Sequence, residues 1–114
     1  MEGRPLSELQ RQLRESFTAA LKAKDAVATA ALRSALAAID NAAAVDSTPG
    51  SMPALGVGTR DFARKELSPG EVREIVRREV SDREAAAIEY ETRAKNDQAR
   101  RLRAEAAVLA GLLD

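Results

Sequence analysis

Acidic side chains that could do chemistry crowd one segment of the chain, residues 68–94. Paired carboxylates of this kind can transfer protons or bind a hard cation. Here they alternate with arginines at a spacing of four residues, which pairs opposite charges along a helix surface. The pairs are Glu74–Arg78 and Glu79–Arg83 in this segment, and Asp97–Arg101 and Arg101–Glu105 in the helix predicted after it. We therefore expect an ion-paired surface, and we predict no catalytic residue and no metal site.

A basic run stands out between residues 93 and 103. It holds five cations opposed only by Asp97, a local charge of +4, namely Arg93, Lys95, Arg100, Arg101 and Arg103. A second basic cluster comprises Arg73, Arg77 and Arg78. Because the guanidinium fork fits phosphate oxygens, such runs favour contact with nucleic acid. A solvated surface without a partner is the alternative for both clusters.

One glycine pair invites comparison with phosphate-binding loops. The element Gly56-Val57-Gly58 lacks the further glycine of a dinucleotide fingerprint and the Gly-Lys-Ser/Thr of a P-loop. No apolar strand precedes it. We interpret these glycines as part of a flexible loop, and we expect no cofactor.

Composition excludes several classes of function. The 114 residues carry 18 Lys+Arg and 18 Asp+Glu, and both histidine and cysteine are absent. Disulfides, Cys/His zinc sites, thiol catalysis and Ser-His-Asp mechanisms are therefore excluded. No apolar stretch is long enough for a membrane span, and the first residues lack the apolar core of a signal peptide. We expect a cytoplasmic protein that binds no membrane.

The elements that would position these residues are helices. Alanine contributes 24 residues and only three are aromatic, which favours an all-α fold with a thin core. Apolar residues recur at helical steps, which predicts a single domain over 1–114 with four helices in two antiparallel hairpins, 6–43 and 68–113. The hairpins are joined by a long connection, residues 45–66, which holds Pro49, Gly50, Pro53, Gly56 and Gly58.

Helix start signals mark all four helices. Ser68, Pro69 and Glu71 form a capping box with proline at its preferred place. Asp25 is the predicted N-cap of the second helix, and Ser7 or Pro5 marks the start of the first. Asn96 or Asp97 is the predicted cap of the last helix.

The ordered residues of both hairpins resemble the GatB/YqeY family. In the first hairpin Leu21 stands where methionine is usual, and the matching residues are Ala20, Lys22, Lys24, Asp25, Leu32, Arg33, Ile39 and Asn41. In the second they are Arg78, Arg83, Tyr90, Glu105, Leu109 and Leu113. The sequence departs from the family at Lys95, where arginine is usual, and at Leu102, where an acid is usual. The second helical lobe typical of the family is not within these 114 residues, so we expect a short form.

The resemblance implies a helical module associated with tRNA. The family is related to the tail of the B subunit of the glutamine-dependent aspartyl/glutamyl-tRNA amidotransferase, so a carbon–nitrogen ligase with glutamine as amide donor is implied only by this relation. Family positions carried over as RNA contacts are Arg33, Arg78, Arg83 and Lys95, to which the basic run adds Arg100, Arg101 and Arg103. For each of the four family positions the alternative is a structural ion pair.

We therefore expect a non-catalytic tRNA-binding accessory protein. Its expected partners are tRNA and either amidotransferase subunits or a second copy of the chain. The alternative is a protein-interaction module or homodimer without nucleic-acid binding, favoured by small residues on the second helix, Ala37, Ala38 and Ala42. An amidotransferase that acts alone is the third and least favoured hypothesis. The excess of alanine and arginine is typical of a bacterial protein.

Overall fold

The computed structural model describes residues 7–44 and 66–114, and every regular element within them is a helix. The helices are α1 (Glu8–Ala23), α2 (Ala26–Ala43), α3 (Pro69–Thr92) and α4 (Asn96–Leu113). The predicted all-α class is confirmed. Nearly all of the connection predicted at 45–66, including its glycine pair, lies outside the described residues.

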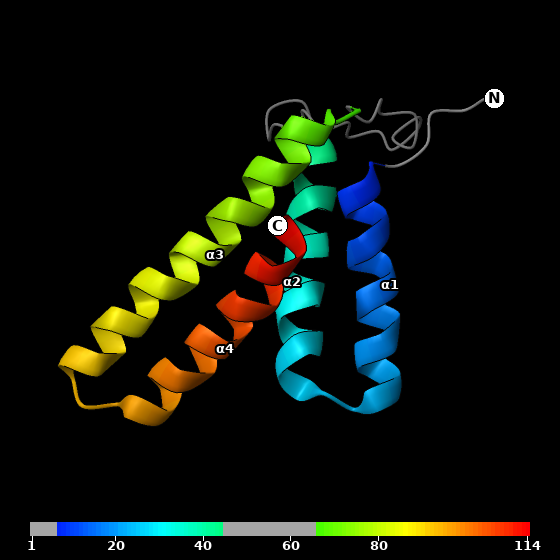
Figure 1. Ribbon diagram of the computed structural model, residues 1–114. Coiled ribbons are helices and arrows are strands. Elements are labelled where there is room, and N and C mark those ends of the chain that lie inside the picture. The colour runs from blue at the N-terminus through cyan, green and yellow to red at the C-terminus, as the bar shows by residue number, and fades with distance from the viewer. Residues whose placement is uncertain (1–6, 45–65) are drawn as a thin grey trace, which may run out of the picture.

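The four helices form two antiparallel pairs that pack against each other, α1 with α2 and α3 with α4 (Figure 1). α1 runs beside α2 in the opposite direction, and α4 returns in the same way along α3. The α3–α4 pair lies at an angle to the first two helices, and α2 contacts all three of the others. The turns that join α1 to α2 and α3 to α4 both lie at the lower edge of the view.

Three of the four helix starts follow the predicted signals. The Ser7 hydroxyl accepts a hydrogen bond from the Gln10 N–H at 3.1 Å, and the Asp25 carboxylate accepts one from the Ala28 N–H at 3.0 Å. At α3 the capping box is complete. The Ser68 N–H donates to the Glu71 carboxylate at 2.8 Å, and the Glu71 N–H donates to the Ser68 hydroxyl at 3.1 Å. These bonds satisfy N–H groups that a helix start leaves unpaired.

The predicted cap of α4 is wrong. Lys95, not Asn96 or Asp97, occupies the N-cap position, and no side chain caps this helix start. The reason is the short turn between α3 and α4. The turn closes at Ala94 with a φ of 62°, so that Asn96 already belongs to the first turn of α4.

The α1–α2 turn is a Schellman motif. Lys24 has left-handed backbone angles, φ 58° and ψ 38°, directly after the last residue of α1. Its N–H donates to the Leu21 carbonyl at 3.2 Å, and the N–H of Asp25 donates to the Ala20 carbonyl at 3.0 Å. This pattern satisfies carbonyls at the end of α1 and reverses the chain within two residues. Asp25 then caps α2.

The main core lies where the helices cross. Its fully buried side chains come from all four helices and include Leu13, Leu32, Val72, Val76 and Leu109. Small residues such as Ala31 and Ala35 let α2 approach its neighbours closely. Three further buried alanines, Ala87, Ala99 and Ala106, belong to α3 and α4 but lie outside this hydrophobic cluster. The part of the α3–α4 pair nearest its turn is thus packed by alanine.

Candidate nucleic-acid interface

The α3–α4 turn carries two exposed cations. Arg93 is the C-cap of α3 and Lys95 is the N-cap of α4, and neither contacts a partner among the described residues. The turn is a second Schellman motif, in which the Ala94 N–H donates to the Glu91 carbonyl at 3.0 Å and the Lys95 N–H to the Tyr90 carbonyl at 2.8 Å. The backbone therefore satisfies its own hydrogen bonds here and leaves the two cationic side chains in water.

The Lys95 side chain makes no hydrogen bond to the helix that it begins, although its carbonyl accepts one from the Ala99 N–H at 3.2 Å. Asp, Asn, Ser and Thr are preferred at the N-cap because their side chains accept hydrogen bonds from the first N–H groups. A lysine side chain has no acceptor, and α4 has no side-chain cap. Lys95 is therefore not the residue that the stability of this helix start would favour.

The three arginines of the basic run that follow Lys95 each contact a carboxylate. Arg100 pairs with Asp97, while Arg103 donates twice to Glu91, at 3.1 and 2.8 Å. The hydrogen bonds from Arg103 lower the pKa of the Glu91 carboxyl below its usual value. Both arginines are exposed, and a guanidinium has five N–H donors, so each retains donors for a further acceptor.

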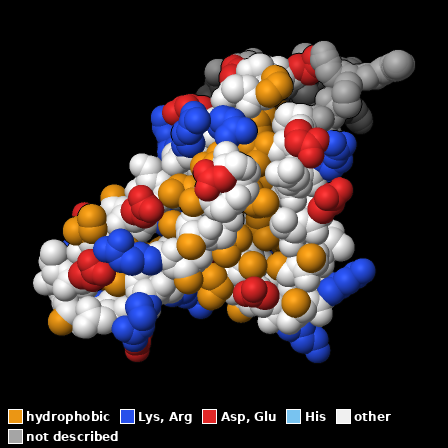
Figure 2. All heavy atoms as spheres, in the orientation of Figure 1, with side chains coloured by type: hydrophobic (Ala, Val, Ile, Leu, Met, Phe, Trp, Pro, Cys, Tyr) orange, Lys and Arg blue, Asp and Glu red, His pale blue; other side chains and the backbone are white. Residues whose placement is uncertain are grey.

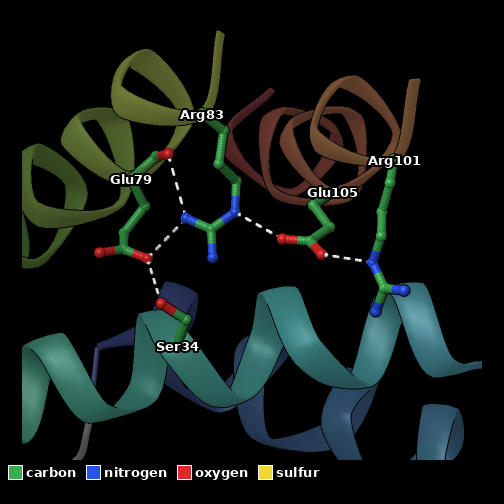
Figure 3. Close-up of polar contacts among 5 residues, drawn as sticks. All are labelled: Ser34, Glu79, Arg83, Arg101 and Glu105. Carbon is green, nitrogen blue, oxygen red and sulfur yellow. Dashed lines mark hydrogen bonds and ion pairs between the residues drawn. The ribbon is translucent and has the colours of Figure 1, made fainter. Parts of the chain in front are cut away.

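Arg83 lies in a partly buried polar network that spans three helices (Figure 3). Its Nε donates to Glu105 of α4 at 2.9 Å, and its Nη1 donates to Glu79 at 2.9 Å. Glu79 also accepts a hydrogen bond of 2.7 Å from the Ser34 hydroxyl of α2, and the Arg101 Nε donates to Glu105 at 3.1 Å. We call these five residues the interhelical network.

In the interhelical network Arg83 is ion-paired. This is the structural role that was the alternative to an RNA contact for this residue. Its side chain is 14% exposed and that of Glu105 is 10% exposed. Burial lowers the pKa of the Arg83 guanidinium, but the hydrogen bonds that it donates to Glu105 and Glu79 outweigh burial and raise this pKa above its usual value. All of its observed contacts are with the protein itself.

The remaining predicted contacts are spread over other surfaces. Arg33 of α2 is exposed, with its guanidinium carbon 5.5 Å from the centre of the Phe17 ring. Arg78 of α3 is exposed and has no partner among the described residues, because Glu74 contacts Arg77 at 3.3 Å instead. The structure therefore brings together the cations of residues 93–103 and does not bring Arg33 or Arg78 to that turn.

Two exposed lysines at the α1–α2 turn were not assigned a role from the sequence. Lys22 and Lys24 have no partner among the described residues. The resemblance pointed to their positions, but only the structure shows that they sit on a turn at the same edge as residues 93–95 (Figure 1).

Within residues 7–44 and 66–114, no group of acidic residues is arranged to hold a metal ion. None of the helices in these ranges is long and apolar enough to cross a membrane. Comparison with protein-family models, curated proteins and solved structures finds no match for this chain. The GatB/YqeY relation therefore stays a prediction from the residues that resemble that family.

Proposed function

We propose that this chain is a GatB/YqeY-like helical module that binds tRNA as a non-catalytic accessory, through the α3–α4 turn. The observation that carries the proposal is the pair Arg93 and Lys95, two exposed cations without a partner among the described residues. They lie in a segment with a local charge of +4. Cations in such a position lose no protein contact when they bind phosphate.

The residues that form this contact differ from the set predicted by resemblance. Arg93 and Lys95 lead it, and the exposed guanidinium groups of Arg100 and Arg103 add donors beside them. Arg83 does not contribute, because a phosphate would have to displace Glu79 and Glu105 from a site largely closed to water. Removing paired charges from each other inside a protein is costly.

The test is a titration of labelled tRNA by fluorescence anisotropy at several salt concentrations. For the unaltered protein we expect binding that weakens steeply with salt, because each neutralised phosphate releases counterions. Arg93→Gln and Lys95→Gln should each reduce the slope of log K against log salt by roughly 0.7–0.9. The matched control is Arg14→Gln, which removes an exposed cation of α1 that has no side-chain partner among the described residues.

Either of two results would contradict the proposal. One is no binding of tRNA at low salt, and the other is an equal slope for Arg93→Gln, Lys95→Gln and Arg14→Gln. Charge reversal at Arg101 is a poor substitute for these variants. Arg101 contacts Glu105, whose side chain is 10% exposed, so reversal would place two like charges together in the interhelical network.

The second candidate is a protein-interaction module or homodimer that does not bind nucleic acid. Large apolar side chains favour it, since Ile88 is 54% exposed and Leu21 is 47% exposed. Ala37 and Ala42 of α2 are also exposed. Sedimentation at high protein concentration tests the homodimer, and a strict monomer would exclude it.

A further inference from the structure

The two helix turns of this protein have the same construction. In each, the N–H of a residue with positive φ donates to the carbonyl three residues before it, and the next residue is the N-cap of the following helix. This residue directly follows α1 in the first turn, whereas Arg93 lies between α3 and Ala94 in the second. Lys24 takes the left-handed position in the α1–α2 turn, with a φ of 58°, and Ala94 takes it in the α3–α4 turn, with a φ of 62°. The positions can therefore be compared one to one.

Lys24 is an unfavourable residue for its position. Glycine is preferred where φ is positive, because any Cβ is crowded by the backbone in that conformation. The Lys24 side chain offers no compensating contact, since it is exposed and has no partner among the described residues. Asp25, the adjacent acid, uses its carboxylate to cap α2. The Lys24 charge interacts favourably with the dipole at the C-terminal end of α1, but no side-chain contact offsets the left-handed backbone. Residues whose local strain is not offset by contacts are expected at functional sites.

The two turns lie at the same end of the molecule. The chain reverses twice at the lower edge of Figure 1, once between α1 and α2 and once between α3 and α4. In the same orientation, Figure 2 shows Lys and Arg side chains projecting at both lower corners. Lys24 belongs to one turn, with Lys22 just before it in the last turn of α1, and Arg93 and Lys95 belong to the other.

We propose that the α1–α2 turn is a second phosphate contact, so that one folded RNA is bound at both turns at once. This inference rests on the proposed function, and it adds a second contact and a preference for folded over single-stranded RNA. The two turns belong to separate helix pairs that are splayed apart (Figure 1). A folded RNA presents phosphates of different strands on a rigid surface, so both turns can be occupied without ordering a flexible chain. The second contact is then intramolecular and adds to the first.

The test compares two glycine substitutions at equivalent positions. Lys24→Gly and Ala94→Gly both relieve the left-handed backbone, so each should raise the midpoint of thermal unfolding by about 4 °C. Only Lys24→Gly removes a cation. We expect it to weaken tRNA binding roughly fivefold to tenfold at 50 mM salt and to lower the salt slope by roughly 0.7–0.9, whereas Ala94→Gly should leave both unchanged.

A single-stranded RNA of matched length and composition separates two-turn binding from general attraction. On this RNA we expect Lys24→Gly to bind as the unaltered protein does, because one turn suffices. Lys24→Asn is a second variant, since asparagine tolerates the left-handed conformation and lacks the charge. Lys24→Asn should weaken tRNA binding as Lys24→Gly does.

The outcomes of this experiment distinguish the inference from the proposed function. If Lys24→Gly and Ala94→Gly bind tRNA equally while Arg93→Gln weakens binding, the second contact is wrong and the proposed function stands. If Lys24→Gly weakens the binding of folded and of single-stranded RNA by the same factor, the preference for folded RNA is wrong. If the unaltered protein binds no RNA, both proposals fail together.

Discussion

Arg83 is a residue whose role, structural or RNA-binding, could not be decided from the sequence. Its spacing from Glu79 predicts an ion pair on a helix surface, and the structure contains that pair at 2.9 Å. Its second partner, Glu105, lies 22 residues away on another helix, and this contact buries both groups. Helical spacing reveals the first contact, but the second depends on how α3 and α4 pack. For that reason the sequence alone could not separate a binding arginine from a structural one.

Removing Arg83 should destabilise the fold strongly. In Arg83→Met the carboxylates of Glu79 and Glu105 remain largely buried and lose their shared partner. Uncompensated buried charge of this kind costs about 3–5 kcal/mol in free energy of unfolding. Urea denaturation followed by circular dichroism measures the change, and a loss below about 1 kcal/mol would contradict the burial described here.

A triple variant tests whether the destabilisation of Arg83→Met comes from unpaired charge or from lost packing. Arg83→Met combined with Glu79→Leu and Glu105→Leu replaces the three most buried charges by apolar groups of similar size. We expect most of the lost stability to return, because apolar replacements of buried ion pairs are often neutral. Arg101 is 53% exposed and would remain in water.

Helix ends show how local chemistry determines the bounds of an element. Ser7, Asp25 and Ser68 were identified from the sequence because an N-cap needs only its own side chain and the next three N–H groups. The N-cap of α4 was misplaced by one or two residues because it depends on where the preceding turn closes. The same locality explains two shifted ion pairs, since Asp97 contacts Arg100 rather than Arg101, and Glu74 contacts Arg77 rather than Arg78.

The starts of α3 and α4 should respond in opposite directions to substitution. Ser68→Ala removes the hydroxyl that accepts from the Glu71 N–H, and we expect a loss of about 1 kcal/mol in the free energy of unfolding. Lys95→Asn introduces an acceptor at a start that has none, and we expect a gain of about 0.5–1 kcal/mol. Thermal unfolding measures both changes. A destabilised Lys95→Asn would show that Lys95 supports the turn in another way.

At the scale of the whole molecule, the packing of the four helices was not predictable from their apolar stripes. The stripes predicted which faces are buried, and residues such as Val72, Val76 and Leu109 are indeed inside. They did not predict that each helix contacts all three others. Helix faces rich in alanine bury little apolar area in any one arrangement. Several ways of packing the four helices are therefore compatible with the same apolar stripes.

The uneven core predicts uneven stability along α3. Near the crossing of the helices, Val76 packs in the main hydrophobic cluster, whereas Ala87 lies outside it. Less apolar area is buried around Ala87, so local opening there should need less free energy. Amide hydrogen exchange should be faster at residues 85–88 than at residues 76–79. Equal protection of the two segments would show that the helix pair opens only as one unit.

The interhelical network also constrains how this sequence can change over evolution. Two carboxylates and two guanidinium groups balance their charges, and Ser34 of α2 adds a hydroxyl that donates to Glu79. A substitution at one member leaves another without its partner, so isolated changes are selected against. Among natural relatives, the residues at positions 79, 83 and 105 should therefore covary, with loss of the arginine accompanied by loss of the acids.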